Sequence, residues 1–399
     1  MSADISNETR LAWRRRYSGP EFLREGFRPM FLAAGLWAAL VVPLWIAVWM
    51  GAISYPGLFD PVTWHVHEMM FGYVGATLGG FVLTAVPNWT GRLPVRGFPL
   101  AALALAWIAG RVAIWWSGEI GAVPTAVLDL AYLGALAIFV GNEIVAGRNW
   151  RNLPVLAGLA LMVAANVLFH LAAMEVADVE GVGVRLSIAV MSLLLALIGG
   201  RIVPSFTRNW LAKRDGPKIA APMGRFDKVA LAVTGVGLAT WVGFAPEPVS
   251  GTLLTAAALL NLARLARWRG WRTLAEPLLT VLHVGYLWLA IGLGLLGVSR
   301  LGDWVPEKLA LHVIAIGAIA TMTLAVMTRA ILGHTGRELH AGPWIAAIYA
   351  LATVPVFTRA AYEIVPAMSL LWATAAAWFL AFALFTAVHA PMVLGLRKS

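Results

Sequence analysis

Long apolar runs dominate the chain, and short polar segments separate them. A helix needs about 20 apolar residues to cross the hydrocarbon core of a bilayer, and by this measure the pattern predicts about twelve transmembrane helices. We therefore expect an all-α integral membrane protein. The predicted spans cover residues 29–52, 64–87, 98–117, 122–146, 153–173, 184–207, 226–245, 249–266, 276–297, 306–331, 342–361 and 366–394.

The composition agrees with this pattern and argues against a separate soluble domain. Hydrophobic residues make up 60% of the 399 residues and charged residues 13%, whereas a soluble domain carries roughly 25% charged residues. Cysteine is absent, which excludes disulfides, thiolate-bound zinc and iron–sulfur clusters held by this chain alone. A metal held by side chains must therefore rest on histidine, methionine or carboxylates.

The net charge of +10 follows membrane topology rather than nucleic-acid binding. With the N-terminus inside, 25 of the 30 basic residues fall on the cytoplasmic side of the predicted spans, as the positive-inside rule requires. Residues 1–28 form a basic tail without the features of a signal peptide. We expect a multi-pass protein of a bacterial inner membrane, surrounded by lipid, with both termini cytoplasmic and no nucleic-acid partner.

Similar sequence at the ends of three spans indicates an internal repeat. His67 precedes Thr90 by 23 residues, and His312 precedes Thr335 by the same number. Four helices per repeat is an even number, so successive repeats would have the same orientation. Chance similarity in an apolar sequence is the alternative. We interpret the single membrane domain, 29–399, as three parallel four-helix repeats at about 29–150, 151–272 and 273–399.

The eight histidines are the main candidates for chemistry, because a titratable side chain inside a bilayer is costly and marks a functional site by default. Haem iron and copper both accept neutral imidazole. His340 and His389 are interpreted as ordinary interfacial residues. We expect cofactor-binding residues among His65, His67, His170 and His312, and metal ligands among His65, His67, His170, His283, His312 and His334.

The sharpest local pattern is WHVHE at residues 64–68. Residues two apart on a helix point about 200° apart, so His65 and His67 serve different sites unless the first turn is unwound. Glu68 is a candidate hydrogen-bond acceptor for His65; alternatively, His65 caps the helix and Glu68 complements its N-terminus. Paired histidines such as His67 and His312, at matching positions of the repeat, would suit a bis-histidine haem.

Other polar residues fall inside the predicted spans. Asn166 lies one turn before His170, on the same helix face. Arg111 and Asp129 fall at similar depth in neighbouring spans, where a structural ion pair is the default interpretation and a proton path the alternative.

These residues resemble the NnrS family. The resemblance rests on FRPMF at 27–31, WHVHEM at 64–69, LTAVPNWTGR at 83–92, RIVPSFTRNW at 201–210, and TMTL, MTR and GHTGR within 321–337. It implies twelve spans, bound haem (of b-type) and copper, and a role in nitric oxide handling or nitrosative stress beside denitrification. It does not assign each histidine to a metal.

The predicted repeat is also similar to the catalytic subunit of haem–copper oxidases and nitric oxide reductases. The span at 184–207 departs from that pattern, because it carries no histidine where that superfamily has copper ligands. Any copper site must then use other residues, such as His170, His283 or His334.

Three functions remain open from the sequence. The leading hypothesis is a haem- and copper-binding membrane protein that acts on nitric oxide. If it turns over a substrate, it is an oxidoreductase that draws electrons from quinol or a periplasmic donor. The second is a twelve-helix transporter whose histidines relay protons, although transporters more often show inverted repeats. The third is a metal-bearing sensor or assembly factor without turnover.

Overall fold

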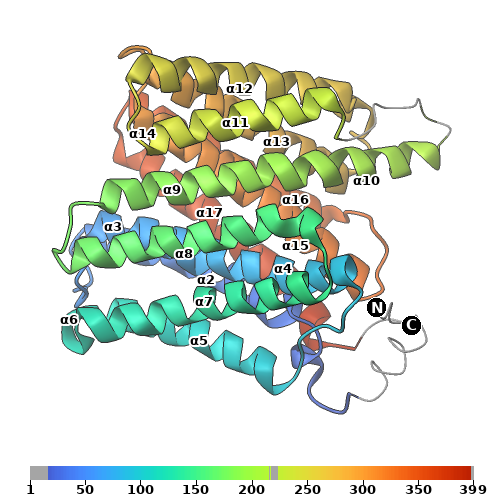
Figure 1. The fold of residues 1–399 in the computed structure, drawn as a ribbon, viewed down its shortest axis with the longest axis horizontal. Helices are drawn as coiled ribbons and strands as arrows, with labels where there is room; N and C mark the ends of the chain where they lie inside the picture. Colours follow the sequence, from blue (N-terminus) through green and yellow to red (C-terminus); the bar gives the residue numbers. More distant parts are fainter. Residues whose placement is uncertain (1–16, 215, 217–222, 397–399) are drawn as a thin grey trace. The chain divides into compact units, whose positions relative to one another are not determined.

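The computed structural model describes residues 17–214, 216 and 223–396, and the regular structure within these ranges is helical, with no strand (Figure 1). The expected all-α membrane fold is confirmed. Eleven helical segments among the described residues are long and apolar enough to cross a membrane. They are Phe27–Trp49, Pro61–Thr90, Phe98–Trp115, Ala122–Ala146, Trp150–Ala173, Glu180–Ala212, Glu247–Arg272, Pro277–Ser299, Glu307–His334, Pro343–Ile364 and Met368–Leu394.

The twelfth predicted span, at 226–245, is present as a helix but differs from the others. This helix, α11 (Arg225–Val242), has 18 residues, and its first turn carries Arg225, Asp227 and Lys228. These charges lower the apolar content of a helix that is already short for a bilayer. Eleven spans therefore meet the criteria of length and composition, and α11 accompanies them as a less apolar helix.

Nine of the predicted spans are single α-helices, four of them preceded or followed by a short helical turn. The long helices are α2 (Phe27–Trp49), α5 (Phe98–Trp115), α7 (Ala122–Ala146), α8 (Leu153–Ala173), α11, α12 (Glu247–Arg267), α13 (Pro277–Ser299), α16 (Pro343–Ile364) and α17 (Met368–Leu394). The short elements are η1 (Glu21–Leu23), α6 (Ser117–Ile120), η3 (Trp150–Asn152) and η5 (Gly270–Arg272).

The other three spans each contain a π-helical segment. These are the three spans whose ends resemble one another in sequence. A π segment adds a residue to the turn, and such segments are frequent at functional sites. The predicted threefold repeat stays a prediction. The composite spans are α3 (Pro61–His67), η2 (Glu68–Tyr73) and α4 (Val74–Thr90); α9 (Glu180–Leu194), η4 (Leu195–Gly199) and α10 (Gly200–Ala212); and α14 (Glu307–His312), η6 (Val313–Ala320) and α15 (Thr321–His334).

The chain forms two compact units. The first comprises residues 1–187, 330–337 and 385–399, and the second comprises residues 188–329 and 338–384. In the first unit α2 packs against α4, α5 packs against α7, and α7 packs against α8 (Figure 1). In the second unit α12 packs between α11 and α13, and α13 packs against η6.

Local sequence fixes the start and the end of the second span. Asp60 accepts hydrogen bonds from the backbone N–H groups of Val62 and Thr63, and Pro61 occupies the first helical position. Both features favour a helix N-terminus. The span ends at Gly91, whose φ of 75° is the left-handed conformation that terminates helices. This span carries His67 and Glu68 into the interior of the first unit.

Candidate metal centre

His67 is the last residue of α3, directly before the π segment η2, and its side chain is fully buried. Three phenylalanine rings surround it: the ring centroids of Phe59, Phe71 and Phe169 lie 5.3, 4.9 and 5.6 Å from that of His67. The imidazole is therefore buried between aromatic rings. A polar group in such surroundings requires partners for both of its nitrogens.

Both ring nitrogens of His67 have those partners. Nδ1 lies 3.1 Å from Oε1 of Glu68, while Nε2 lies 3.2 Å from Oδ2 of Asp129 and 2.9 Å from Oδ1 of Asn166. Asn166 also donates to Oδ2 of Asp129 over 2.7 Å, and Nε2 of His170 lies 3.0 Å from the same oxygen. Asp129 is thus the centre of a buried network that joins α3, α7 and α8.

Arg111 completes this network from α5. Its guanidinium donates to Oε1 of Glu68 over 2.8 Å and to Oδ1 of Asp129. The predicted Arg111–Asp129 ion pair is therefore confirmed. We call the set His67, Glu68, Arg111, Asp129, Asn166 and His170 the His67 cluster; each of its members is at most 6% exposed.

The formal charges of the His67 cluster do not balance. Glu68 and Asp129 contribute two negative charges, and Arg111 contributes one positive charge. The remainder is one negative charge in a region where unpaired charge is expensive. A proton on an imidazole or a bound cation supplies the missing positive charge. The formal charges of the cluster are therefore compatible with a bound cation.

Three atoms of the cluster have the spacing of metal ligands. Nε2 of His67, Oδ2 of Asp129 and a ring nitrogen of His170 lie within 4.8 Å of one another. A tetrahedral ion with bonds of about 2.0–2.1 Å holds neighbouring ligand atoms about 3.3 Å apart, close to the 3.0 and 3.2 Å from Asp129 to the two imidazoles. The three residues present therefore fit a metal ion.

Glu68 adds a feature that recurs at metal sites. A histidine that binds a metal through one nitrogen usually donates its other N–H to a carboxylate or carbonyl, which fixes the tautomer and the ring orientation. Glu68 occupies that position on Nδ1 of His67. The sequence makes Glu68 a candidate acceptor for His65, with stabilisation of the helix N-terminus as the alternative, whereas the structure shows its carboxylate against His67 and Arg111.

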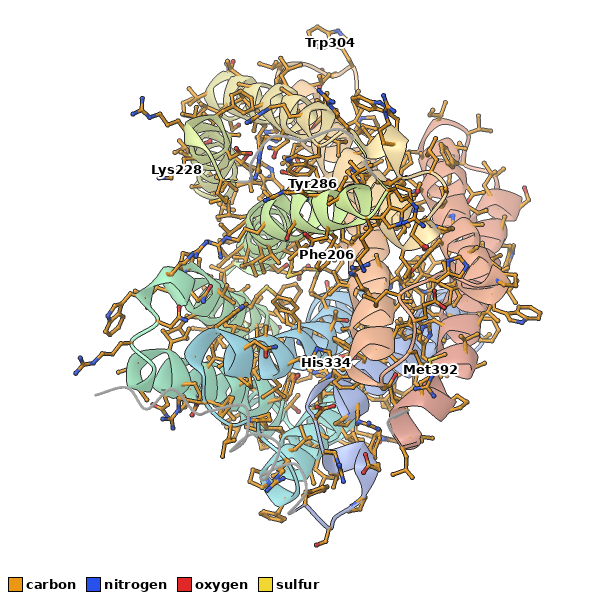
Figure 2. All side chains as sticks on the ribbon, turned by 90° about the vertical axis from the view of Figure 1, so that its right-hand side faces the viewer. Phe206, Lys228, Tyr286, Trp304, His334 and Met392 are labelled. Atoms are coloured by element: carbon orange, nitrogen blue, oxygen red, sulfur yellow. The ribbon has the colours of Figure 1, made fainter. Side chains whose placement is uncertain are left out.

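The other predicted ligands lie apart from the His67 cluster or in the second unit. His65 stacks on Trp45 with ring centroids 4.4 Å apart. Because α3 is regular through both residues, the side chains of His65 and His67 point about 200° apart and face different neighbours, as the sequence predicts. His334 packs beside Phe27 and lines a cavity of about 60 Å³ in the first unit; Figure 2 labels it.

Two predicted ligands belong to the second unit. Nδ1 of His312 donates to the backbone carbonyl of Lys308 over 2.7 Å, which leaves Nε2 as its unprotonated nitrogen. Nε2 of His283 lies 2.8 Å from the hydroxyl of Thr207, and its ring packs edge-on against Trp268. Since His67 and His312 lie in different units, their pairing around a haem stays a prediction.

A second buried polar network occupies the second unit. Arg264, fully buried on α12, donates to Oδ1 of Asp227 over 3.1 Å, to Oδ1 of Asn261 over 3.2 Å and to the hydroxyl of Tyr286 over 2.6 Å. Figure 2 shows Tyr286 on α13 within this unit, whereas Lys228 of α11 lies at its surface. We call Asp227, Asn261, Arg264 and Tyr286 the Arg264 cluster.

Sequence reasoning missed the Arg264 cluster, because it counted Arg264 only among the basic residues on the cytoplasmic side. One signal was available. Asn261 and Arg264 are three residues apart inside a helical pattern and so share a face. Two polar side chains on one face of an otherwise apolar helix indicate a buried network.

Comparison with known proteins identifies the family. Residues 21–397 match the family described as NnrS protein. The chain belongs to the NnrS family. The match covers nearly all of the described helices, including every residue of both polar clusters, and a search of curated proteins found no matching relative. Membership supports a role in the response to nitric oxide for this NnrS-family membrane protein.

Proposed function

We propose that this NnrS-family protein binds a copper ion at His67, Asp129 and His170, and that the ion binds nitric oxide. The unbalanced charge of the His67 cluster carries the proposal, because three metal-ligand atoms converge where one positive charge is missing. Imidazole is a favoured copper ligand. A copper(I) ion bound there brings the formal charge of the cluster from −1 to zero.

The same donor set defines the main alternative for the metal. Two histidines and one carboxylate with open positions are typical of non-haem iron(II) sites. Metal analysis must therefore measure iron beside copper. In either case a diatomic ligand would bind the ion beside these three protein ligands, and Asn166 would be close to it, since its Oδ1 lies 2.9 Å from Nε2 of His67.

Haem remains part of the proposal, at other histidines. Both nitrogens of His67 already face oxygen atoms, so an axial bond from His67 to a haem iron would require the departure of Asp129 and Asn166. His312 fits the role better, since its hydrogen bond to the Lys308 carbonyl directs the lone pair of Nε2 outward. We propose His312 as a haem ligand.

The finer form of the proposal is a redox enzyme of a bacterial inner membrane, with both termini cytoplasmic. Two molecules of nitric oxide take up two electrons and two protons to give nitrous oxide and water. Quinol or a periplasmic carrier would supply the electrons. The basic residues between the spans support this orientation.

The experiment is metal analysis and spectroscopy of the protein purified after expression with copper, iron and haem available. We expect bound copper, haem bands in the reduced-minus-oxidised spectrum, and a spectral change when nitric oxide is added. His67→Ala and His170→Ala should each lose the copper, whereas His340→Ala, a change of the same kind at an exposed histidine outside the spans, should retain it.

Two other outcomes would change the assignment. A purified protein without metal and without colour would exclude the proposal and favour a transporter, in which the buried carboxylates and histidines of the His67 cluster relay protons. Metal binding without consumption of nitric oxide under reducing conditions would favour a sensor or an assembly factor.

A further inference from the structure

An apolar cavity of about 270 Å³ lies in the first unit, lined by residues of η1, α2 and α5. Its lining consists of apolar and tryptophan side chains, among them Ala33, Leu36, Ala104 and Ile108. Leu36 and Ile108 are 46% and 48% exposed. On membrane-spanning helices such exposed apolar side chains face lipid, so the cavity opens toward the acyl chains of the bilayer.

Two tryptophans form the inner wall of this cavity. Trp37 and Trp107 both line it, with their rings edge-to-face and their centroids 6.0 Å apart. Trp107 donates from Nε1 to the carbonyl of Gly72 over 3.0 Å, and the guanidinium carbon of Arg111 lies 6.0 Å from its ring centroid. The inner wall of the cavity is therefore in contact with the π segment η2 and with the His67 cluster.

The wall comes close to the His67 cluster at Gly72. A Cβ atom there would clash with Nε1 of Trp37 and lie 2.9 Å from Oε2 of Glu68, so glycine fits without rearrangement. Neither of these two buried polar atoms has a hydrogen-bond partner among the described residues. Trp37, which lines the cavity, and the carboxylate of Glu68 thus both pack against this glycine.

We propose that this cavity is the site through which nitric oxide enters from the bilayer and reaches the His67 cluster. The proposal rests on the proposed function, because it requires nitric oxide to bind at that cluster. Nitric oxide is an uncharged diatomic that dissolves in hydrocarbon and needs no hydrogen bonds. A small displacement of the Trp37 or Trp107 side chain is enough to pass it inward, a motion available to side chains at ordinary temperature.

The chemistry of the lining favours nitric oxide over a larger redox partner such as quinol. The hydroxyl groups of a quinol would lose their hydrogen bonds to water in a cavity whose lining offers no polar partner. The only polar atoms on the two tryptophans are directed away from the cavity, since Nε1 of Trp107 bonds to Gly72 and Nε1 of Trp37 is buried against it. Apolar gases, by contrast, bind in dry apolar cavities.

The test fills the cavity and measures both occupancy and entry. Ala33→Phe and Ala104→Phe place a phenyl ring in it, and Ala102→Phe, on the exposed part of the same helix α5, is the matched control. Xenon binding, followed by ¹²⁹Xe NMR, reports the cavity without any need for metal. The association rate of nitric oxide with the metal centre, followed after flash photolysis, reports entry.

We expect the native protein and Ala102→Phe to bind xenon, and the two filled variants to lose it. The filled variants should associate with nitric oxide about tenfold more slowly with unchanged metal content, because the added ring must be displaced for the ligand to pass. Trp37→Phe, which thins the wall and breaks no hydrogen bond, should associate faster than the native protein.

The outcomes separate the two proposals. Native association rates in variants that have lost xenon would show that nitric oxide enters elsewhere and would overturn this inference, while leaving the metal centre intact. Absence of xenon binding in the native protein would overturn it as well. A native protein that binds xenon but gives no nitric oxide signal would instead exclude the proposed function, and the entry route with it.

Discussion

The two buried polar clusters differ in charge balance, although each contains an Arg–Asp pair. In the Arg264 cluster one buried guanidinium faces one carboxylate, and Asn261 and Tyr286 are neutral partners. The partly exposed Arg267 also lies 3.4 Å from Asp227. In the His67 cluster one guanidinium faces two carboxylates, with two histidines beside them. The first arrangement is complete without a further ion, whereas the second needs one more positive charge, from a proton on an imidazole or from a bound cation.

This difference separates a structural network from a candidate binding site. A balanced pair in an apolar interior holds helices together and loses stability when one partner is removed. An unbalanced cluster with imidazole nitrogens at metal-ligand distances is suited to hold a cation. The comparison predicts that mutations in the Arg264 cluster change stability, and that mutations in the His67 cluster change metal content.

The largest effect is expected for Arg264→Met. It leaves the buried Asp227 with the backbone N–H of Gly224 and the peripheral Arg267, and without its buried cation, so the protein should lose about 3–5 kcal/mol of stability. Thermal unfolding in detergent measures the loss. Metal content per folded protein should stay at the native level. Arg267→Met, at a residue whose side chain is 36% exposed, is the matched control and should cost less than about 1 kcal/mol.

Asp129→Asn should produce the largest change in metal binding. It removes the carboxylate oxygen that lies near both imidazoles, while the amide keeps the size of the side chain. We expect the affinity for copper to fall at least about hundredfold, as measured by competition with a chelator of known affinity. Native copper content in a folded Asp129→Asn protein would disprove the assignment of the site.

Glu68→Gln tests the carboxylate behind His67. The amide can still accept a hydrogen bond from Nδ1, but it carries no charge, so the copper affinity should fall about tenfold. The same competition assay measures it. A change in stability does not alter the copper affinity of the protein that remains folded. An unchanged copper affinity in Glu68→Gln would therefore show that Glu68 has only a structural role toward Arg111.

The smallest effect is expected outside both clusters, where the exposed side chain of His340 pairs with the buried Glu276. Nδ1 of His340 lies 2.9 Å from Oε2 of Glu276, and this hydrogen bond raises the pKa of His340 above its ordinary value. A raised pKa means that the stabilisation is complete below about pH 6.5, the unfolded value, and is lost as the pH rises through the folded pKa.

The pH dependence of the melting temperature measures that contribution. The native protein should lose slightly more stability than His340→Gln between mildly acidic and alkaline pH. Equal slopes for the two proteins would contradict the prediction. Metal content should not differ between them, because His340 lies in the second unit and outside the His67 cluster.

Much of the fold could be predicted from the hydrophobic pattern. All twelve predicted spans are helices, and their bounds agree within a few residues except at the composite spans, which extend beyond their apolar parts. The π segments could not be predicted, because they depend on how side chains of neighbouring helices fill the space beside the backbone. Gly72, within η2, illustrates this: the indole of Trp37 and the carboxylate of Glu68 occupy the place of its missing side chain.

The sequence by itself determined that this protein lies in a membrane, where its helices are, and which residues are able to bind metal. Apolar runs of bilayer length, absent cysteine and few intramembrane polar residues suffice for that. It also placed Arg111 and Asp129 at similar depth in neighbouring spans, and it placed Asn166 on the face of His170, since helical periodicity fixes which residues of one helix share a face.

Only the tertiary structure decided which of these residues meet. Helical periodicity relates residues within one helix, but the partner of His67 depends on how separate helices pack. Packing brings Asp129 of α7 and Asn166 and His170 of α8 to its Nε2, and Arg111 of α5 to Glu68. This packing leaves the formal charges of the His67 cluster one negative charge out of balance. That charge, and the metal centre proposed from it, exist only in the folded protein.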